Sequence, residues 1–335
     1  MTKSGAPIRI IFMGTPEIAI PALLSLRGVE RRSNLQIVAV ITQPDRPVGR
    51  THALTPPPVK VAAEKIGLQV LQPEKLRDPQ TIRQIRAFTP DLMVVAAYGQ
   101  IVPKAIIEMP KYGAINIHPS LLPKYHGASP IQAAIAAGET ETGVTIMLMD
   151  VELDHGPILA QTRVPIAQDE TGDSLSEKLA AVGAELLAAT LPDLIAGNVR
   201  PQEQNHSQAT LTKTLTRDDA KINWHESAEI IERKIRAYDP WPGTWTMWKM
   251  RLNILKAVIL SPDGIRNEGS PTNVGPGTTF KTKTGFAVAC GSGALEGLEL
   301  HPAGRRTMSA AEFLRGHPEI VGTVLSSRAL RLGSG

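Results

Sequence analysis

The sequence has one cysteine, few aromatic residues and no long apolar stretch, and each shortage excludes a class of protein. Cys290 is the single cysteine among 335 residues, so no disulfide can form within the chain. It ends the apolar run Phe286–Cys290 without an adjacent cation, so we expect a buried strand thiol and no nucleophile. No window approaches the length needed to span a bilayer, and the start lacks an apolar leader. We therefore expect a cytoplasmic protein with no membrane contact.

Two phosphate-binding motifs are also missing. The apolar run Ile8–Phe12 ends in a turn at Gly14, but no second and third glycine follow at the spacing of the dinucleotide fingerprint. No glycine-rich loop ending in Gly-Lys-Ser or Gly-Lys-Thr occurs anywhere in the chain. Chemistry based on nicotinamide cofactors or nucleoside triphosphates is therefore disfavoured.

Length and charge indicate two globular domains with different surfaces. A chain of 335 residues exceeds the usual size of a single domain. Residues 1–207 carry 19 basic and 20 acidic side chains, whereas residues 208–335 carry 17 and 12. The second part therefore has a modest positive excess, which attracts polyanions or simply forms a solvated surface.

The first 200 residues alternate between apolar runs and helical segments, which predicts βαβ units and a doubly wound α/β domain. At the first turn, Gly14 allows a tight bend, Thr15 can cap a helix, and Pro16 suits the first helical position. Ligands in such domains bind beyond the carboxyl ends of the strands. The segments concerned are strands at 8–12, 36–42, 91–97, 113–117 and 143–149 and helices at 58–66 and 175–196.

The chain becomes polar from Ser207 to Ala220, which is typical of a linker. A helix near 227–236 and short strands such as 252–260, broken by Gly and Pro, then predict a small β-barrel. Three tryptophans lie in this part, Trp241, Trp245 and Trp248. We expect them to form a packing knot between the domains, because large aromatic side chains dominate core and interface burial; stacking on bases is the alternative.

The densest group of chemically active residues begins at Asn116 and His118. These two residues are two positions apart at the end of an apolar strand, so an extended strand presents them on one face. The following loop is rich in proline, and we expect its backbone groups to be free for a ligand. Asp154 follows the next strand, 143–149, on a loop that can return to the same crevice.

An amide, an imidazole and a carboxylate suit acyl transfer to an amine. Histidine exchanges a proton near neutral pH, asparagine can hydrogen-bond an oxyanion, and aspartate can orient the imidazole. Ordinary turn and capping roles remain an alternative for each residue alone. A metal site is a rival, although no paired spacing such as His-Glu-x-x-His supports it. Its ligands would be His118, His126, Asp154 and His155.

Seven segments in order carry a resemblance that covers nearly the whole chain. They are Phe12–Pro16, Thr42–Arg50, Ala97–Pro103, Ile115–Pro123, Leu153–Pro157, Asp239–Gly243 and His301–Gly304 with Met308–Phe313. In these segments the chain resembles the methionyl-tRNA formyltransferase family.

The resemblance implies a Rossmann-like catalytic domain at residues 1–207, a linker at 208–220, a barrel of OB type at 221–328 and a tail at 329–335. It assigns catalysis to Asn116, His118 and Asp154. It places folate contacts at Ser120, Leu121, Leu122 and Pro123, with Tyr98 in a further matching segment. No metal is implied.

The resemblance further implies that the amino group of methionine on initiator tRNA attacks the formyl carbon of 10-formyltetrahydrofolate. We expect a monomer that binds tRNA through one arginine loop and several barrel cations. These residues are Arg46, Arg50, Lys249, Arg251, Lys281, Lys283, Arg305 and Arg306. The chain departs from the family by having Thr51-His52-Ala53 where Gly-Lys-Lys is usual, and Lys124-Tyr125-His126 where Arg-Trp-Arg is common.

Other functions remain open at this point. The first domain would look much the same in a folate-dependent formyltransferase acting on glycinamide ribonucleotide or an amino sugar nucleotide. A hydrolase of formyltetrahydrofolate would use the same catalytic residues with water as acceptor. A non-catalytic nucleic-acid-binding protein is a fourth reading, in which Asn116 and His118 are replaceable.

Overall fold

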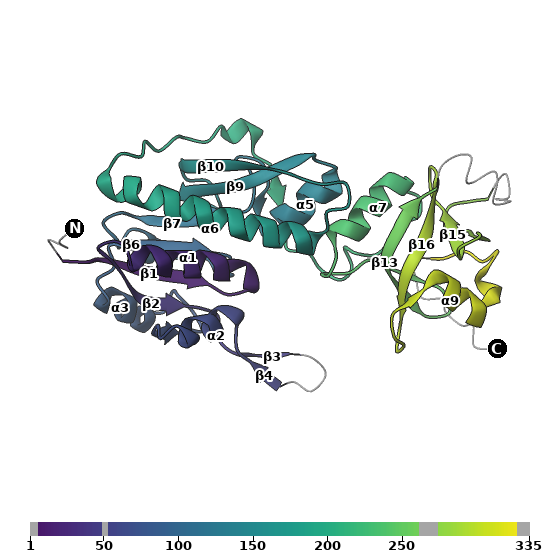
Figure 1. Cartoon of the computed structure of the whole chain (residues 1–335), viewed down its shortest axis with the longest axis horizontal. Coiled ribbons are helices and arrows are strands. Elements are labelled where there is room, and N and C mark those ends of the chain that lie inside the picture. The colour runs from purple at the N-terminus through teal and green to yellow at the C-terminus, as the bar shows by residue number, and fades with distance from the viewer. Residues whose placement is uncertain (1–5, 49–52, 261–273, 327–335) are drawn as a thin grey trace. The chain divides into compact units, whose positions relative to one another are not determined.

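The computed structural model describes residues 6–48, 53–260 and 274–326, and the chain divides into two compact units (Figure 1). Unit 1 takes the chain up to Pro130, then Glu141–Pro165 and Ser176–Thr212. Unit 2 takes Ile131–Thr140, Ile166–Leu175 and the chain from Lys213 onward. Unit 2 thus includes two short stretches from within the first 207 residues.

Unit 1 is built on a seven-stranded sheet in the order β10-β9-β7-β6-β1-β2-β5. The neighbouring strands β5, β2, β1, β6 and β7 run parallel, whereas β9 pairs antiparallel with both β7 and β10. The strands are β1 (Ile8–Gly14), β2 (Leu35–Ile41), β5 (Val70–Leu71), β6 (Leu92–Ala96), β7 (Ala114–His118), β9 (Glu141–Leu148) and β10 (Ile158–Pro165). The predicted parallel-rich α/β domain is therefore confirmed.

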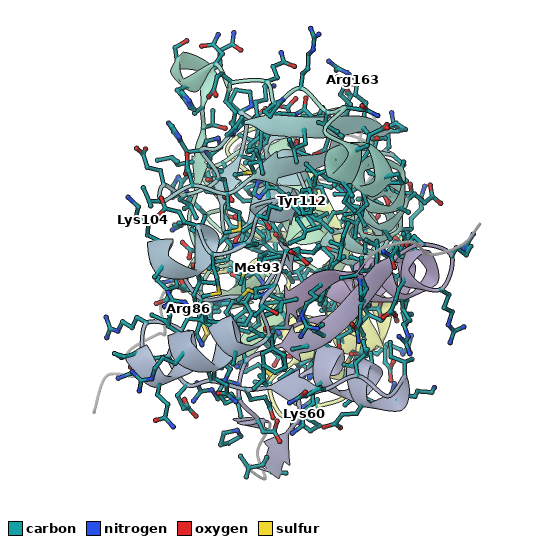
Figure 2. All side chains as sticks on the ribbon, turned by 90° about the vertical axis from the view of Figure 1, so that its left-hand side faces the viewer. Lys60, Arg86, Met93, Lys104, Tyr112 and Arg163 are labelled. Atoms are coloured by element: carbon teal, nitrogen blue, oxygen red, sulfur yellow. The ribbon has the colours of Figure 1, made fainter. Side chains whose placement is uncertain are left out.

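Side chains of β1 alternate between two buried layers, as a sheet covered on both faces requires. Ile10 and Phe12 pack with one group of helices, and Ile11 and Met13 pack with another. Helices α1 (Ile20–Glu30), α2 (Pro58–Lys65) and α6 (Gly172–Ala196) cover the first face, and α3 (Pro79–Ala87) and α4 (Lys104–Ile107) cover the second. Figure 2 shows Met93 inside this unit, with Lys60, Arg86, Lys104 and Arg163 around it.

Helix α6 corrects the expectation that no segment is long enough for a membrane. It passes a length and hydropathy test for a membrane-spanning helix, with a hydropathy of 1.6 in its most apolar window. Leu187 and Leu191 pack in the core beside the sheet, and Gly183 lies against Ile117 where a Cβ would come within 3.0 Å. Because 33% of that window is buried, packing against the sheet accounts for part of the apolar character of α6.

The turn after β1 differs from the expectation in its details. The Thr15 hydroxyl caps no helix and donates to the Tyr98 carbonyl at 2.7 Å. Pro16 precedes the short helix η1 (Glu17–Ala19) as its N-cap. Gly14 is needed for close packing, because a Cβ there would lie 2.9 Å from the Ala19 Cβ.

Unit 2 has a six-stranded antiparallel sheet in the order β12-β13-β16-β15-β14, with β17 beside β16. The strands are β12 (Trp245–Met247), β13 (Arg251–Ile259), β14 (Thr279–Lys281), β15 (Phe286–Ala289), β16 (Ala294–Pro302) and β17 (Met308–Ser309). Helices α5 (Pro130–Ala137), α7 (Ala228–Ala237) and α9 (Ala310–Gly316) complete this part of the chain. Cys290 is buried as expected, and burial raises the pKa of its thiol to about 12.

Two smaller pairs of strands complete the described chain. β3 (Arg46–Val48) and β4 (Ala53–Thr55) form an antiparallel hairpin. β8 (His126–Gly127) pairs with β11 (Leu211–Thr212), and this pair lies beside the loops of the candidate site described below. Two short helical turns, η2 (His206–Gln208) and η3 (Pro318–Ile320), are the remaining regular elements.

Candidate active site

Asn116, His118 and Asp154 meet at the carboxyl end of β7. The Asn116 Nδ2 donates to the Asp154 Oδ1 at 3.3 Å, and the His118 Nδ1 lies 3.6 Å from the same oxygen. Asn116 and His118 therefore share one face of the strand, as their spacing predicts. Asp154 comes from the loop after β9, which is the neighbour of β7 in the sheet.

The tautomer of His118 follows from a backbone contact. The His118 Nε2 lies 2.9 Å from the Tyr125 carbonyl oxygen, which can only accept a hydrogen bond. Nε2 therefore carries a proton, and Nδ1 is the nitrogen that takes up or releases a second proton. Nδ1 is also the nitrogen that faces Asp154 and Asn116.

Burial and charge act in opposite directions on His118. The side chain is only 4% exposed, and this desolvation lowers the pKa of the imidazole below its ordinary value. The Asp154 charge and the Tyr125 hydrogen bond raise the pKa, and His126 lowers it slightly. The net direction is downward, so burial favours the neutral form of His118, whose Nδ1 can accept a proton.

Asp154 is held in a specific orientation by its own backbone and by Gly127. Its φ is 54°, in the left-handed region that most residues avoid. The Gly127 N–H donates to the Asp154 Oδ2 at 2.7 Å, so each carboxylate oxygen has a donor. A carboxylate fixed in this way can stabilise an imidazolium at His118 as it forms.

Together these groups can catalyse acyl transfer to an amine without a nucleophilic side chain. Neutral His118 can accept a proton at Nδ1, and the second N–H of Asn116 can bond a developing oxyanion. Asp154 supplies the opposite charge that the protonated imidazole needs.

The loop predicted to contact folate has a backbone that is largely occupied, contrary to expectation. The Ser120 carbonyl and the Leu122 N–H both bond to the Thr145 hydroxyl, and the Leu122 carbonyl accepts from Gln161. The Ser120 hydroxyl donates to the Lys124 carbonyl at 2.6 Å, and Ser120 is fully buried. Proline-rich loops thus need not leave their polar groups free, because neighbouring strand side chains can bind them.

The other predicted folate residues differ in accessibility. Leu121 and Pro123 are partly exposed, whereas Leu122 is buried. Tyr98 is 2% exposed in the core, and its hydroxyl has no partner among the described residues. Desolvation raises the pKa of Tyr98 to about 12. A folate contact at Tyr98 stays a prediction.

The rival metal arrangement is not found in the part of the chain that the structure describes. His126 is bonded to Gln204 through Nε2 at 3.1 Å. His155 bonds to Asp150 at 2.8 Å and stacks on His206 with ring centroids 3.7 Å apart. These two histidines therefore fix loops next to the site.

The predicted arginine loop is the β3–β4 hairpin of unit 1. Arg46 lies at its base, where the guanidinium is 3.3 Å from the Glu74 carboxylate, and both side chains are exposed. Arg50 lies outside the described residues. The contact of either arginine with tRNA stays a prediction.

Two of the barrel cations predicted to bind tRNA form ion pairs with carboxylates of the same unit. Lys249 pairs with Glu319, and Arg306 pairs with Glu312. The remaining exposed members are Lys281, Lys283 and Arg305. Pairing with exposed carboxylates leaves less free positive charge on this surface than the sequence suggests.

Arg251 belongs to a cluster of cations and tryptophans, and no other cation of this cluster was predicted from the sequence. Its guanidinium carbon lies 4.4 Å from the centre of the Trp245 ring, and the Lys221 ammonium lies 5.5 Å from the same ring. Arg217 lies 5.6 Å from the Trp241 ring. We call these five residues the Trp245 surface. Arg217 lies within the predicted linker and Lys221 directly follows it, and clustered tryptophans are the signal that could have found them.

The expected packing role holds for one tryptophan and is wrong for another. Trp248 is buried against Phe313 in the core of unit 2. Trp241 is 52% exposed, and Trp245 is partly exposed. The DPWPG segment therefore presents the Trp241 ring to solvent beside Arg217.

The fold and the site define the class of protein, which is a two-domain formyl transferase. The family model described as "Formyl transferase" matches residues 8–191. The model described as "Formyl transferase, C-terminal domain" matches residues 214–318. The structure of HypX from Aquifex aeolicus in complex with tetrahydrofolic acid has the same fold, with a TM-score of 0.61 at 15% identity. That match covers 94% of this chain and 48% of HypX.

Relatives with higher sequence identity show to which family of formyl transferases the chain belongs. The methionyl-tRNA formyltransferase of Chloroflexus aurantiacus is 47% identical over 312 residues, which are 92% of this chain and 97% of that protein. The methionyl-tRNA formyltransferase of Roseiflexus sp. (strain RS-1) is 45% identical, with 98% of each chain covered. The chain belongs to the methionyl-tRNA formyltransferase family.

Proposed function

We propose that the chain transfers the formyl group of 10-formyltetrahydrofolate to the amino group of methionine on initiator tRNA. The observation that carries this proposal is the convergence of Asn116, His118 and Asp154 in a member of this family. The product, N-formylmethionyl-tRNA, serves translation initiation, so we expect the protein in the cytoplasm.

The proposed reaction assigns one role to each of the three residues. The amine nitrogen bonds to the formyl carbon, and the amine proton passes to the His118 Nδ1, directly or through a water. Asn116 donates to the oxyanion of the tetrahedral intermediate, and Asp154 stabilises the imidazolium. The bond from the formyl carbon to the folate nitrogen then breaks, and the proton held by His118 is returned to that nitrogen.

The low pKa of His118 fits this role. An α-amino group has a reference pKa of about 7.7 to 8.0, so a base must remove its proton before or during attack. A neutral imidazole is available because burial opposes its protonation. As the amine loses its proton, Asp154 offsets the cost of charging the buried ring.

For the second unit we propose a barrel of OB type that binds tRNA through the Trp245 surface. In the described part of the chain, no carboxylate lies within ion-pair distance of Arg217, Lys221 or Arg251. Burial, and then the charge of Arg217, lower the pKa of Arg251, with Asp218 opposing them. Cations held together beside indole rings suit phosphates and stacked bases.

The Trp245 surface is tested by salt dependence. Each phosphate contact that is lost reduces the slope of log Kd against log salt by about 1. We expect this reduction for Arg251→Ala and Arg217→Ala, with the site chemistry unchanged. Arg86→Ala, an exposed arginine of unit 1, serves as the control. Slopes equal to that control would show that tRNA binds elsewhere.

The overall function is tested by presenting one donor to several acceptors. The protein is incubated with 10-formyltetrahydrofolate and charged initiator tRNA, glycinamide ribonucleotide, an amino sugar nucleotide or buffer, and loss of the formyl group is followed. Formyl loss with the charged tRNA alone supports the proposal. Formyl loss with another acceptor or with buffer, and none with tRNA, would replace it.

A further inference from the structure

One segment of unit 1 contacts both loops of the candidate site, although its second half falls in the predicted linker. Residues 202–212, here called the 202–212 segment, follow α6 and its loop. The segment begins by pairing with β10, where Gln202 and Ile158 exchange two backbone hydrogen bonds. It ends as β11, which pairs with β8. Between these two points it passes the residues that carry Asp154.

Gln204 makes the contact with the Asp154 loop. Its side-chain amide donates to the Asp154 carbonyl at 2.8 Å and to the Gly156 carbonyl at 2.7 Å. Its side-chain oxygen lies 3.1 Å from the His126 Nε2, which donates to it. Gln204 is 6% exposed, so these bonds form away from solvent and are costly to lose.

Two threonines of the same segment hold the loop that faces His118. The Tyr125 N–H donates to the Thr210 hydroxyl at 2.8 Å, and the His126 N–H donates to the Thr210 carbonyl at 2.8 Å. The Thr212 hydroxyl donates to the His126 carbonyl at 2.9 Å. Gly127 packs so closely that a Cβ would lie 2.3 Å from the Thr212 carbonyl oxygen.

The loops held in this way are the ones that orient the reacting side chains. Tyr125 supplies the carbonyl that sets the tautomer of His118, and Gly127 supplies the N–H that binds Asp154. Tyr125 and Asp154 both have positive φ, at 63° and 54°. Such backbone is unfavourable for these residue types and persists where surrounding contacts fix it.

From these contacts we propose that Gln204 is a positioning residue for the reaction. It acts through Asp154 by fixing the left-handed turn that aims the carboxylate at Asn116, His118 and Gly127. Through His126 it couples that turn to the loop that holds His118. The proposal rests on the proposed formyl transfer, since it assigns Gln204 to the same site.

The test compares Gln204→Glu and Gln204→Leu with Gln202→Ala. Gln202 is the matched control, because it lies in the same segment and is exposed. Glutamate keeps the size of Gln204 but loses both donors when ionised, and it regains one donor when protonated. Misplacement of a catalytic group by about 1 Å can cost on the order of 100-fold in rate. We expect kcat to fall about 10- to 100-fold in Gln204→Glu, with KM for the formyl donor nearly unchanged.

The pH profile separates positioning from a general structural defect. The ratio of kcat in Gln204→Glu to that of the wild type should rise as pH falls, since the protonated carboxyl group donates again. A kcat within about twofold of the Gln202→Ala control, or an equal loss at every pH with a matching rise in KM, would overturn the proposal. Wild-type formyl transfer is measured first: its absence refutes the proposed function, whereas an active wild type with an equally active variant refutes the role of Gln204 alone. If Gln204→Leu does not fold, Gln204→Glu decides.

Discussion

Replacing Asp154 by asparagine removes one charge from the site and should leave the tautomer of His118 intact. The carboxylate lies 3.6 Å from the His118 Nδ1, and both side chains are at most 10% exposed. Two unit charges at this distance attract by about 4.6 kcal/mol at an effective dielectric constant of about 20. If about half of the imidazolium charge has formed in the transition state, the substitution removes about 2 kcal/mol of transition-state stabilisation. This corresponds to a decrease of about 30-fold in kcat.

The backbone contact at Nε2 keeps this expected loss small. In serine proteases the same substitution costs about 10,000-fold, because the histidine then adopts the wrong tautomer. Here the Tyr125 carbonyl holds the Nε2 proton at 2.9 Å whether or not residue 154 is charged. A loss above about 1000-fold in Asp154→Asn would show that Asp154 sets the tautomer after all.

The pH profile of the same variant gives a second measurement. The Asp154 charge raises the pKa of His118 against the effect of burial. Without that charge the pKa falls further, so His118 stays neutral to lower pH. The acidic limb of kcat should therefore move to lower pH in steady-state assays of formyl transfer. A shift to higher pH, or kcat reduced less than about threefold, would refute the electrostatic role.

Three further predictions follow from the same geometry. Asn116→Ala should lose about 100- to 1000-fold in kcat with KM largely kept, as for removal of an oxyanion donor; unchanged turnover would remove Asn116 from the mechanism. Gly127→Ala should lower both the thermal midpoint and kcat, because its φ is 104° and the added Cβ would meet the Thr212 carbonyl oxygen at 2.3 Å; a wild-type midpoint in calorimetry would contradict the packing. Cys290, with its pKa raised to about 12 by burial, should resist iodoacetamide at pH 8 until the protein unfolds; labelling of the native protein at the rate of a free thiol would show that the strand is open.

Strand periodicity was sufficient to predict the centre of the site. Asn116 and His118 are two residues apart on a buried strand, and this spacing alone places them on one face. Asp154 could be expected nearby because it follows β9, which pairs with β7. The parallel-rich sheet and helix α7 were predictable for the same reason, since both depend on local apolar patterns.

The contacts that orient the three residues could not be read from the sequence. The Tyr125 carbonyl, the Gly127 N–H and the Gln204 amide reach the site through backbone conformations with positive φ and through contacts between residues 7 to 50 positions apart. No residue pattern encodes such pairings. The second half of the 202–212 segment was predicted as a linker from its polar composition, whereas the side chains of Thr210 and Thr212 bind another segment of unit 1.

The solvent exposure of the tryptophans could not be predicted from the sequence either. Trp248 and Trp241 are only seven residues apart in the chain, yet one lies in the core and the other is half exposed. The surroundings of a tryptophan depend on strand pairing. Trp245 and Arg251, for example, come together because they lie on the adjacent antiparallel strands β12 and β13. Charge counts showed that residues 208–335 carry an excess of positive charge. They could not show which of these cations form ion pairs with carboxylates.

The central claim is that Asn116, His118 and Asp154 transfer a formyl group to methionine on tRNA. The most direct measurement is a single turnover of wild type and of Asn116→Ala with isotopically labelled 10-formyltetrahydrofolate and charged initiator tRNA. The amino acid is then released from the tRNA and identified by mass spectrometry. We expect labelled N-formylmethionine from the wild type and at least about 100-fold slower formation with the variant. Unlabelled methionine from the wild type, or equal rates for both proteins, would contradict the account.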